Sequence, residues 1–136
     1  EVIDFSWNHD LSGTIPSDVG NMLNLRSINF FYGDFSGFLP PELGSLPNLI
    51  SINLYDNRFY GPIPSELGNS TSLQSLSFSN NRFCDYIPDD VCNNSNLITF
   101  SVNNNRLLGD EQWGGVPGCV SYFGYQQNTY LSCPEP

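Results

Sequence analysis

The sequence predicts a solenoid of five right-handed coils, with a parallel β-sheet on the concave face and short 3-10 or helical turns on the convex face. Three observations predict this fold class. Segments that begin at Leu25, Leu49, Leu73 and Leu97 align at a period of 24 residues, and an earlier copy ends at Asn24. Each segment opens with alternating apolar and polar residues, and most continue through a turn into a proline-containing stretch. Such a period is typical of repeats that are stable only when stacked.

The opening of each segment predicts one short strand of the concave sheet. Alternation such as Ile52, Asn53, Leu54, Tyr55 has the two-residue period of a strand with one buried face. Stacked coils then pair these strands side by side. The outward residues of successive strands are therefore expected to form columns that run across the coils.

An asparagine follows most of these strands, at the ninth position of the repeat. Its amide can bond backbone groups where the chain turns. We therefore expect buried structural ties at Asn57, Asn81, Asn105 and, after a one-residue shift, Asn8. Gly33 takes this place in the second repeat, which predicts a locally looser coil.

A glycine, an Ile-Pro or Leu-Pro pair and an acidic residue mark the passage to the convex face. Proline fixes φ and lacks a backbone donor, so it suits an extended segment that leads into a helical turn. The acids complement the free N–H groups of a first helical turn, so we assign them to the scaffold rather than to a metal or substrate site. They are Asp18, Glu42, Glu66 and Asp90.

The shared pattern, LxxLxLxxNxLxGxIPxxLGxLxx, resembles the plant-type leucine-rich repeat over residues 1 to 110. Repeats of this type occur in plant receptor-kinase ectodomains and are similar to those of the plant inhibitors of pectin-degrading polygalacturonases. The resemblance implies an extracellular module, either secreted or part of a membrane protein, that recognises a protein or peptide through its concave face.

The repeats divide as 1–24, 25–48, 49–72, 73–96 and 97–110, and residues 111–136 change character. Trp113, Tyr122 and Phe123 are among the apolar residues that predict a C-terminal cap over the last coil. The first coil has no comparable cover. We therefore expect upstream residues or a partner chain against it, and the start at Glu1 without Met indicates a processed or trimmed chain.

The composition of the chain limits the classes of partner that we expect. The chain carries 14 acidic residues against four basic ones, for a net charge of −10, so it should repel nucleic acid and anionic membranes. No stretch approaches the roughly 18 apolar residues of a membrane span. His9 is the one histidine, and no Ser or Cys has a recognisable base near it in the repeat frame. We expect neither an enzyme nor a cofactor or metal.

Cysteines and glycosylation sequons indicate an oxidising, extracellular compartment. Four cysteines allow three disulfide pairings, of which we favour Cys84 with Cys92 inside one coil and Cys119 with Cys133 inside a disulfide-bonded cap. Sequons begin at Asn69 and Asn93, both at the same repeat position, on the side away from the sheet. Ser70 and Asn94 replace an apolar residue beside them, which predicts local exposure.

The residues that point outward from the concave sheet form the candidate ligand-binding surface, which has two parts. Its first three coils are aromatic and its last two are small and polar. Neighbouring strands lie about 4.8 Å apart, so the rings are expected to form one patch, and exposed aromatic clusters mark interfaces. The alternative is that the rings only cover one another or pack on a missing coil. The residues concerned are Trp7, Phe31, Tyr32, Tyr55, Asn80 and Asn103.

A basic column completes the candidate site: Arg58, Arg82 and Arg106 follow Asp34 at repeat position ten. Like charges in adjacent coils are unfavourable unless neutralised. One interpretation is an internal ion-pair network with Asp34, Asp56 and Asp85. The other is a site for a carboxylate or sulfate of a peptide or glycan.

Three classes of function remain open. The first is the extracellular protein or peptide recognition module. The second is a polysaccharide-binding or ice-binding protein that uses the Ser, Thr and Asn columns. The third is a structural subunit of a larger extracellular assembly, docked through its first coil.

Overall fold

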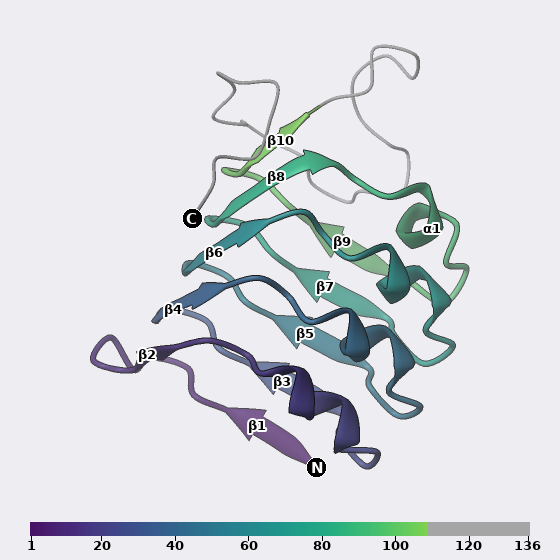
Figure 1. Ribbon diagram of the computed structural model, residues 1–136, viewed down its shortest axis with the longest axis horizontal. Coiled ribbons are helices and arrows are strands. Elements are labelled where there is room, and N and C mark those ends of the chain that lie inside the picture. Colours follow the sequence, from purple (N-terminus) through teal and green to yellow (C-terminus); the bar gives the residue numbers. More distant parts are fainter. Residues whose placement is uncertain (109–136) are drawn as a thin grey trace.

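The computed structural model describes residues 1–108, in which successive coils each add one strand to a parallel concave sheet (Figure 1). Ser51 pairs with Ser27 at the repeat period, whereas Ser27 pairs with Val2, so the first coil is one residue longer. The predicted solenoid is confirmed. The strands, in spatial order, are β1 (Val2–Asp4), β3 (Ser27–Asn29), β5 (Ser51–Asn53), β7 (Ser75–Ser77) and β9 (Thr99–Ser101).

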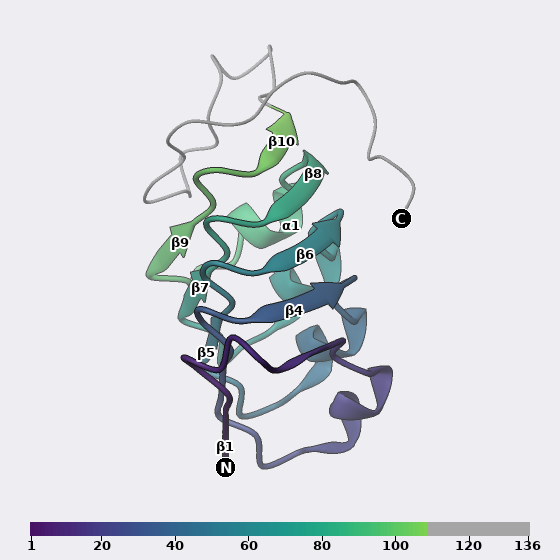
Figure 2. The ribbon, with the colours of Figure 1, turned by 90° about the vertical axis from the view of Figure 1, so that its left-hand side faces the viewer.

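A second parallel sheet, which we did not predict from the sequence, lies beside the first (Figure 2). Its register differs from that of the concave sheet, because Arg58 lies opposite Ser36, two residues short of the repeat period. Phe59 and Gly61 of its third strand are buried while Arg58 is exposed. In spatial order the strands are β10 (Arg106–Leu108), β8 (Arg82–Tyr86), β6 (Arg58–Gly61), β4 (Asp34–Gly37) and β2 (Ser12–Gly13).

Short helical turns form the third side of each of the first four coils, as predicted. They are η1 (Ser17–Asn21), η2 (Pro41–Ser45), η3 (Ser65–Asn69) and α1 (Asp89–Cys92). Each follows an extended proline and has an acidic residue in its first turn, without a side-chain cap. A Cβ at Gly44 would lie only 2.0 Å from the carbonyl oxygen of Glu66, so glycine allows neighbouring turns to stack closely. Within residues 1–108, no helix has the length and apolar character of a membrane span.

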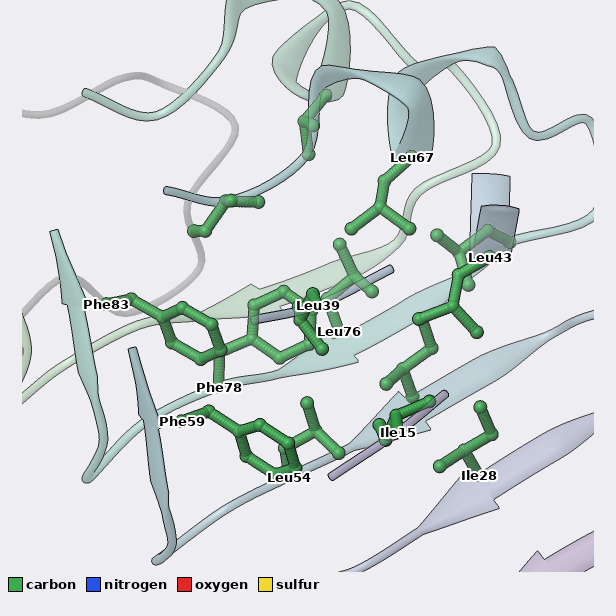
Figure 3. Packing of buried hydrophobic residues seen from close by; sticks show 14 of the residues in the cluster. Ile15, Ile28, Leu39, Leu43, Leu54, Phe59, Leu67, Leu76, Phe78 and Phe83 are labelled. Atoms are coloured by element: carbon green, nitrogen blue, oxygen red, sulfur yellow. The ribbon is translucent and has the colours of Figure 1, made fainter. Parts of the chain in front are cut away.

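The core fills the space between the two sheets and the helical turns. Figure 3 shows Phe59, Phe78 and Phe83 with Leu43 and Leu67 of the turns. The rings of Phe59 and Phe83 are parallel, with centroids 6.4 Å apart, and neither is exposed. Burying each such ring contributes roughly 1.5–3 kcal/mol. Equivalent residues of successive coils therefore supply one continuous core.

The predicted asparagine ties are hydrogen-bond bridges between coils. The Asn81 side chain donates to the carbonyl of Leu54 (2.7 Å) and accepts from the N–H of Phe59 (2.9 Å), both in the preceding coil. Asn105 repeats these bonds with Phe78 and Phe83. Asn57 does the same with Phe30 and Phe35 but is only half-buried. Each asparagine thus joins the concave strand of one coil to the second sheet of the same coil.

Asn8 was wrongly expected to be buried. Its amide donates to the carbonyls of Phe5 (3.2 Å) and Ser6 (2.9 Å) in its own coil, and the residue is exposed. No earlier coil in the described chain offers the two backbone groups that Asn81 finds. Gly33 has no side chain to form a bridge, so the first and second coils lack this tie.

The expectation that Ser70 and Asn94 are exposed is also wrong, because both are buried, at 4% and 9% of their accessible surface. Asn94 donates to the carbonyls of Ser70 (2.8 Å) and Leu67 (3.4 Å). The Ser70 hydroxyl accepts from the N–H of Leu73 (3.3 Å). Hydrogen bonds therefore satisfy polar groups at a position that other coils fill with an apolar residue. The sequon residues Asn69 and Asn93 are themselves exposed.

Cys84 lies buried in β8 and Cys92 half-buried at the end of α1, and both are disulfide-bonded. Cys119, Cys133 and the expected cap lie outside the described residues. The favoured pairing therefore stays a prediction.

We expect Asn81→Ala to lower the free energy of unfolding by about 3 kcal/mol, because it leaves the buried N–H of Phe59 and carbonyl of Leu54 without a partner. Chemical denaturation followed by circular dichroism measures the change. Asn8→Ala is the matched control, and we expect less than about 0.5 kcal/mol from it because its bonds are exposed. Equal losses in the two variants would contradict the bridging role.

We expect Asp85→Gly to raise the free energy of unfolding by about 1 kcal/mol. Asp85 has a left-handed backbone (φ 69°), and Gly37 and Gly61 hold the equivalent place in earlier coils with φ of 94° and 86°. Glycine adopts this conformation without steric cost. Asp90→Gly in the first turn of α1 should instead lower stability. A loss of stability in Asp85→Gly would show that its bond to the N–H of Tyr86 (2.9 Å) outweighs the strain.

Candidate functional site

Four aromatic side chains form one continuous cluster where the first three coils leave the concave sheet, as predicted. We call Trp7, Phe31, Tyr32 and Tyr55 the aromatic ridge. Trp7 stacks on Tyr32 with ring centroids 4.3 Å apart and meets the Phe31 ring edge-on at 5.5 Å. Tyr55 extends the ridge into the third coil, 5.4 Å from Tyr32. Such pairs contribute about 0.5–1.5 kcal/mol each beyond the area they bury.

Of the ridge residues only Trp7 is exposed, with 64% of its surface accessible, while the other three are half-buried. The rings therefore cover one another in part, as the alternative interpretation expected, yet they leave a large indole face open. A partner that covered this face would bury much apolar area at little cost in side-chain entropy.

Two residues of the ridge occupy a backbone position that disfavours them. The eighth position of the repeat has a left-handed conformation in every described coil. Its φ is 60° at Trp7, the equivalent residue of the first coil, 56° at Tyr32, 59° at Asp56, 58° at Asn80 and 54° at Asn104. Asn and Asp tolerate it, but bulky side chains are outliers that cost of order 1–3 kcal/mol. The first two coils thus place large rings where the later coils use residues suited to the turn.

Inter-coil hydrogen bonds maintain this strained conformation. The N–H of Trp7 donates to the carbonyl of Phe31 (3.0 Å), and the N–H of Tyr32 donates to that of Tyr55 (2.9 Å). Asp56 makes the same bond to Ser79 at 3.1 Å. The backbone therefore presents the ridge side chains from a fixed position in each coil.

The polar columns of the concave face are largely occupied by bonds among themselves. In Asp4, hydrogen bonds from Ser6 and Asn29 lower the pKa of the carboxyl group. Asn80, a predicted ligand residue, accepts from Asn104, and Asn103 is half-buried. Groups already paired have less to offer an extended polar ligand. The bonds between coils include Ser27 with Ser51 (2.8 Å), Thr99 with Ser75 (2.8 Å) and Asn104 with Asn80 (2.7 Å).

The arginine column lies beside the concave face rather than on it, because Arg58, Arg82 and Arg106 begin strands β6, β8 and β10 of the second sheet. Arg58 forms an ion pair with Asp34 at 2.9 Å. Within residues 1–108, this is the ion pair that the column makes, so the predicted network is reduced to one pair. Arg82 is exposed and Arg106 half-buried.

A polar pocket of about 280 Å³ lies between the aromatic ridge and this ion pair. We did not predict it. It opens beside Gly33, at the place where other coils have the bridging asparagine. A Cβ on Gly33 would come within 2.8 Å of the Phe35 ring and 3.0 Å of Asn57 Oδ1. The glycine at position 33, in place of the repeated asparagine, was the feature of the sequence that could have predicted this pocket. The lining residues are His9, Tyr32, Gly33, Asp34, Asp56, Asn57 and Arg58.

Tyr32 belongs to both the ridge and the pocket. A hydrogen bond with Tyr55 and the charge of that residue raise the pKa of Tyr32, and burial and the negative charge of Asp56 add smaller effects. Its hydroxyl therefore stays protonated near neutral pH. Tyr32 therefore contributes a neutral aromatic side chain to the lining of the pocket.

The open end of the first coil carries a second, apolar hollow of about 290 Å³. Its walls include Ile3, Phe5, Met22 and Phe30. The expected partner chain or upstream coil at this end stays a prediction. Within residues 1–108, no three His, Cys, Asp or Glu side chains are grouped to hold a metal ion.

The leucine-rich repeat family model matches residues 48–70 and 72–94, and no curated protein sequence matches the chain. Among solved structures, the leucine-rich repeat ectodomain of the plant membrane receptor kinase GASSHO1/SCHENGEN3 from Arabidopsis thaliana, in complex with CASPARIAN STRIP INTEGRITY FACTOR 2, has a TM-score of 0.79. It is 30% identical over 92% of this chain and 15% of that one.

Two further structures from Arabidopsis are similar. The receptor kinase HAESA, in complex with the peptide hormone IDA and the co-receptor SERK1, is 26% identical with a TM-score of 0.74, over 86% of this chain and 20% of that one. The BIR2 ectodomain is 31% identical with a TM-score of 0.73, over 86% of this chain and 62% of that one. The chain thus spans between 15% and 62% of these proteins' lengths. With its 24-residue repeats and this likeness, it is a plant-type leucine-rich repeat protein, similar to the ectodomains of plant receptor kinases.

Proposed function

We propose that this chain is an extracellular recognition module that binds a protein or peptide through the aromatic ridge. The observation that carries the proposal is the position of Trp7 and Tyr32, large rings held at strained backbone positions with the Trp7 indole open to solvent. Strained residues of this kind cluster at ligand contacts. The paired hydroxyl and amide columns offer fewer free groups to a polysaccharide or ice surface.

The comparisons support the same class of partner. GASSHO1/SCHENGEN3 was solved with CASPARIAN STRIP INTEGRITY FACTOR 2, and HAESA with a peptide hormone and a co-receptor. An extracellular location is further supported by the disulfide-bonded Cys84 and Cys92 and by the exposed sequon residues Asn69 and Asn93. Both sequons lie at the helical turns, on the side of the solenoid away from the concave sheet, so glycans there would leave the ridge uncovered.

We expect Trp7→Ala and Tyr55→Ala to weaken binding at least tenfold, because each removes part of the contact surface. Biolayer interferometry against an array of small secreted plant peptides and receptor ectodomains measures it. Tyr86→Ala is the matched control, since Tyr86 is a 53% exposed aromatic residue of the second sheet. Binding partners that Trp7→Ala and Tyr55→Ala leave unaffected would refute the role of the ridge. A thermal unfolding scan must show that the variants remain folded.

We expect both sequons to carry glycans when the chain is secreted from plant cells, because Asn69 and Asn93 are exposed. Peptide-N-glycosidase digestion should then lower the mass of the wild-type chain by two glycans, and that of Asn69→Gln or Asn93→Gln by one. An unchanged mass would argue against the proposed compartment. Ligand binding should survive in both variants, because these residues lie away from the ridge.

A further inference from the structure

We propose that the polar pocket beside the ridge binds the guanidinium group of an arginine side chain supplied by the protein or peptide ligand. The inference rests on the proposed function, since the ridge would hold the rest of the ligand. The pocket, of about 280 Å³, combines an aromatic side chain with a carboxylate that forms no ion pair within residues 1–108. That volume admits one side-chain head group and is smaller than most small-molecule sites.

The charges that line the pocket leave one carboxylate uncompensated. Asp34 is neutralised by Arg58, whose guanidinium lies 2.9 Å from its carboxylate. Asp56, by contrast, makes only backbone hydrogen bonds within residues 1–108, to Ser79 and from Gly33. A cation in the pocket would complete a second ion pair. An anion would have to displace Asp34 from Arg58, so the arrangement favours a cation.

The shape of the cation follows from Tyr32. Tyr32 lines the pocket and stacks on Trp7 of the ridge. A planar guanidinium can lie against an aromatic ring while its N–H groups reach a carboxylate. A lysine ammonium matches this combination of flat wall and lateral acceptor less well.

Gly33 leaves this space open. In the later coils the equivalent asparagine fills the position and bonds backbone groups of the preceding coil. At Gly33 even a Cβ would approach the Phe35 ring and Asn57 Oδ1 too closely. The net charge of −10 also attracts a cationic ligand over distances beyond direct contact.

Backbone amide shifts in a ¹⁵N-labelled sample of the full chain test the proposal. The probe is N-acetyl-arginine N-methylamide, and the matched probe is its citrulline counterpart, which is neutral but of nearly the same shape. We expect saturable shifts confined to residues 32–34 and 56–58 with arginine. Citrulline should bind about tenfold more weakly. Equal binding of the two probes, or shifts spread over the acidic surface, would overturn the proposal.

Asp56→Asn should weaken arginine binding about tenfold, and asparagine also tolerates the left-handed backbone at this position. Glu66→Gln is the control, because it removes one exposed acid on the helical side. Equal effects of the two variants would contradict a specific site. Tighter binding of N-acetyl-lysine N-methylamide than of the arginine probe would overturn the choice of guanidinium.

The outcome separates this inference from the proposed function. If a protein or peptide from the array loses affinity in Trp7→Ala but arginine does not titrate the pocket, the ridge function stands and the pocket inference fails. If arginine titrates the pocket while Trp7→Ala changes no binding partner, the pocket stands and the ridge function fails.

Discussion

Hydrogen bonds between successive coils, at the turn that follows each concave strand, are the interaction on which the rest of this solenoid depends. Two kinds of hydrogen bond occur at this turn. The N–H of the left-handed residue donates to the next coil, as Tyr32 does to Tyr55. The bridging asparagine bonds two backbone groups of the preceding coil, as Asn81 does with Leu54 and Phe59. Together they determine where one sheet ends and the other begins, so they also position every residue at the edge between the sheets.

That fixed turn explains why the candidate site lies in the first three coils. Asn80 and Asn104 suit the left-handed position and bond each other, which makes that end of the edge part of the scaffold. Trp7 and Tyr32 do not suit it, so the inter-coil bonds must offset their strain. The same coils lack the asparagine bridge, because Asn8 bonds within its own coil and Gly33 has no side chain. Strained residues and an open pocket therefore occur together in the first coils.

Most of the concave architecture follows from the 24-residue period, because each buried residue recurs in register. The roles of Asn57, Asn81 and Asn105 were predictable for the same reason, since a repeated amide after a strand has few other uses. The exposure of Asn8 was not predictable, because burial at this position depends on a neighbouring coil rather than on the residue's own sequence. The clustering of Trp7, Phe31, Tyr32 and Tyr55 followed from strand spacing alone.

The second sheet was harder to anticipate. Its strands are short, and the outward positions of β6 hold Arg58 and Tyr60 rather than a regular polar pattern. Its register also slips two residues against the repeat, as the pairing of Ser36 with Arg58 shows. The arginines therefore could not be assigned to the correct surface from column position. Ser70 and Asn94 were misjudged because polar character suggests exposure, whereas satisfied hydrogen bonds permit burial.

Gly33 replaces the asparagine that bridges coils elsewhere, and the second repeat has part of a pocket at this position. Its absent side chain removes a bridge that elsewhere joins the concave strand to the second sheet. Beside it, Asp34 pairs with Arg58. That pair engages Arg58, and within residues 1–108 no ion pair neutralises Asp56. A regular coil at this point would have filled the same volume with a bridging amide, as Asn81 does two coils later. The pocket therefore lies where one hydrogen-bonded bridge is absent. Its negative charge comes from Asp56, because Arg58 pairs with Asp34.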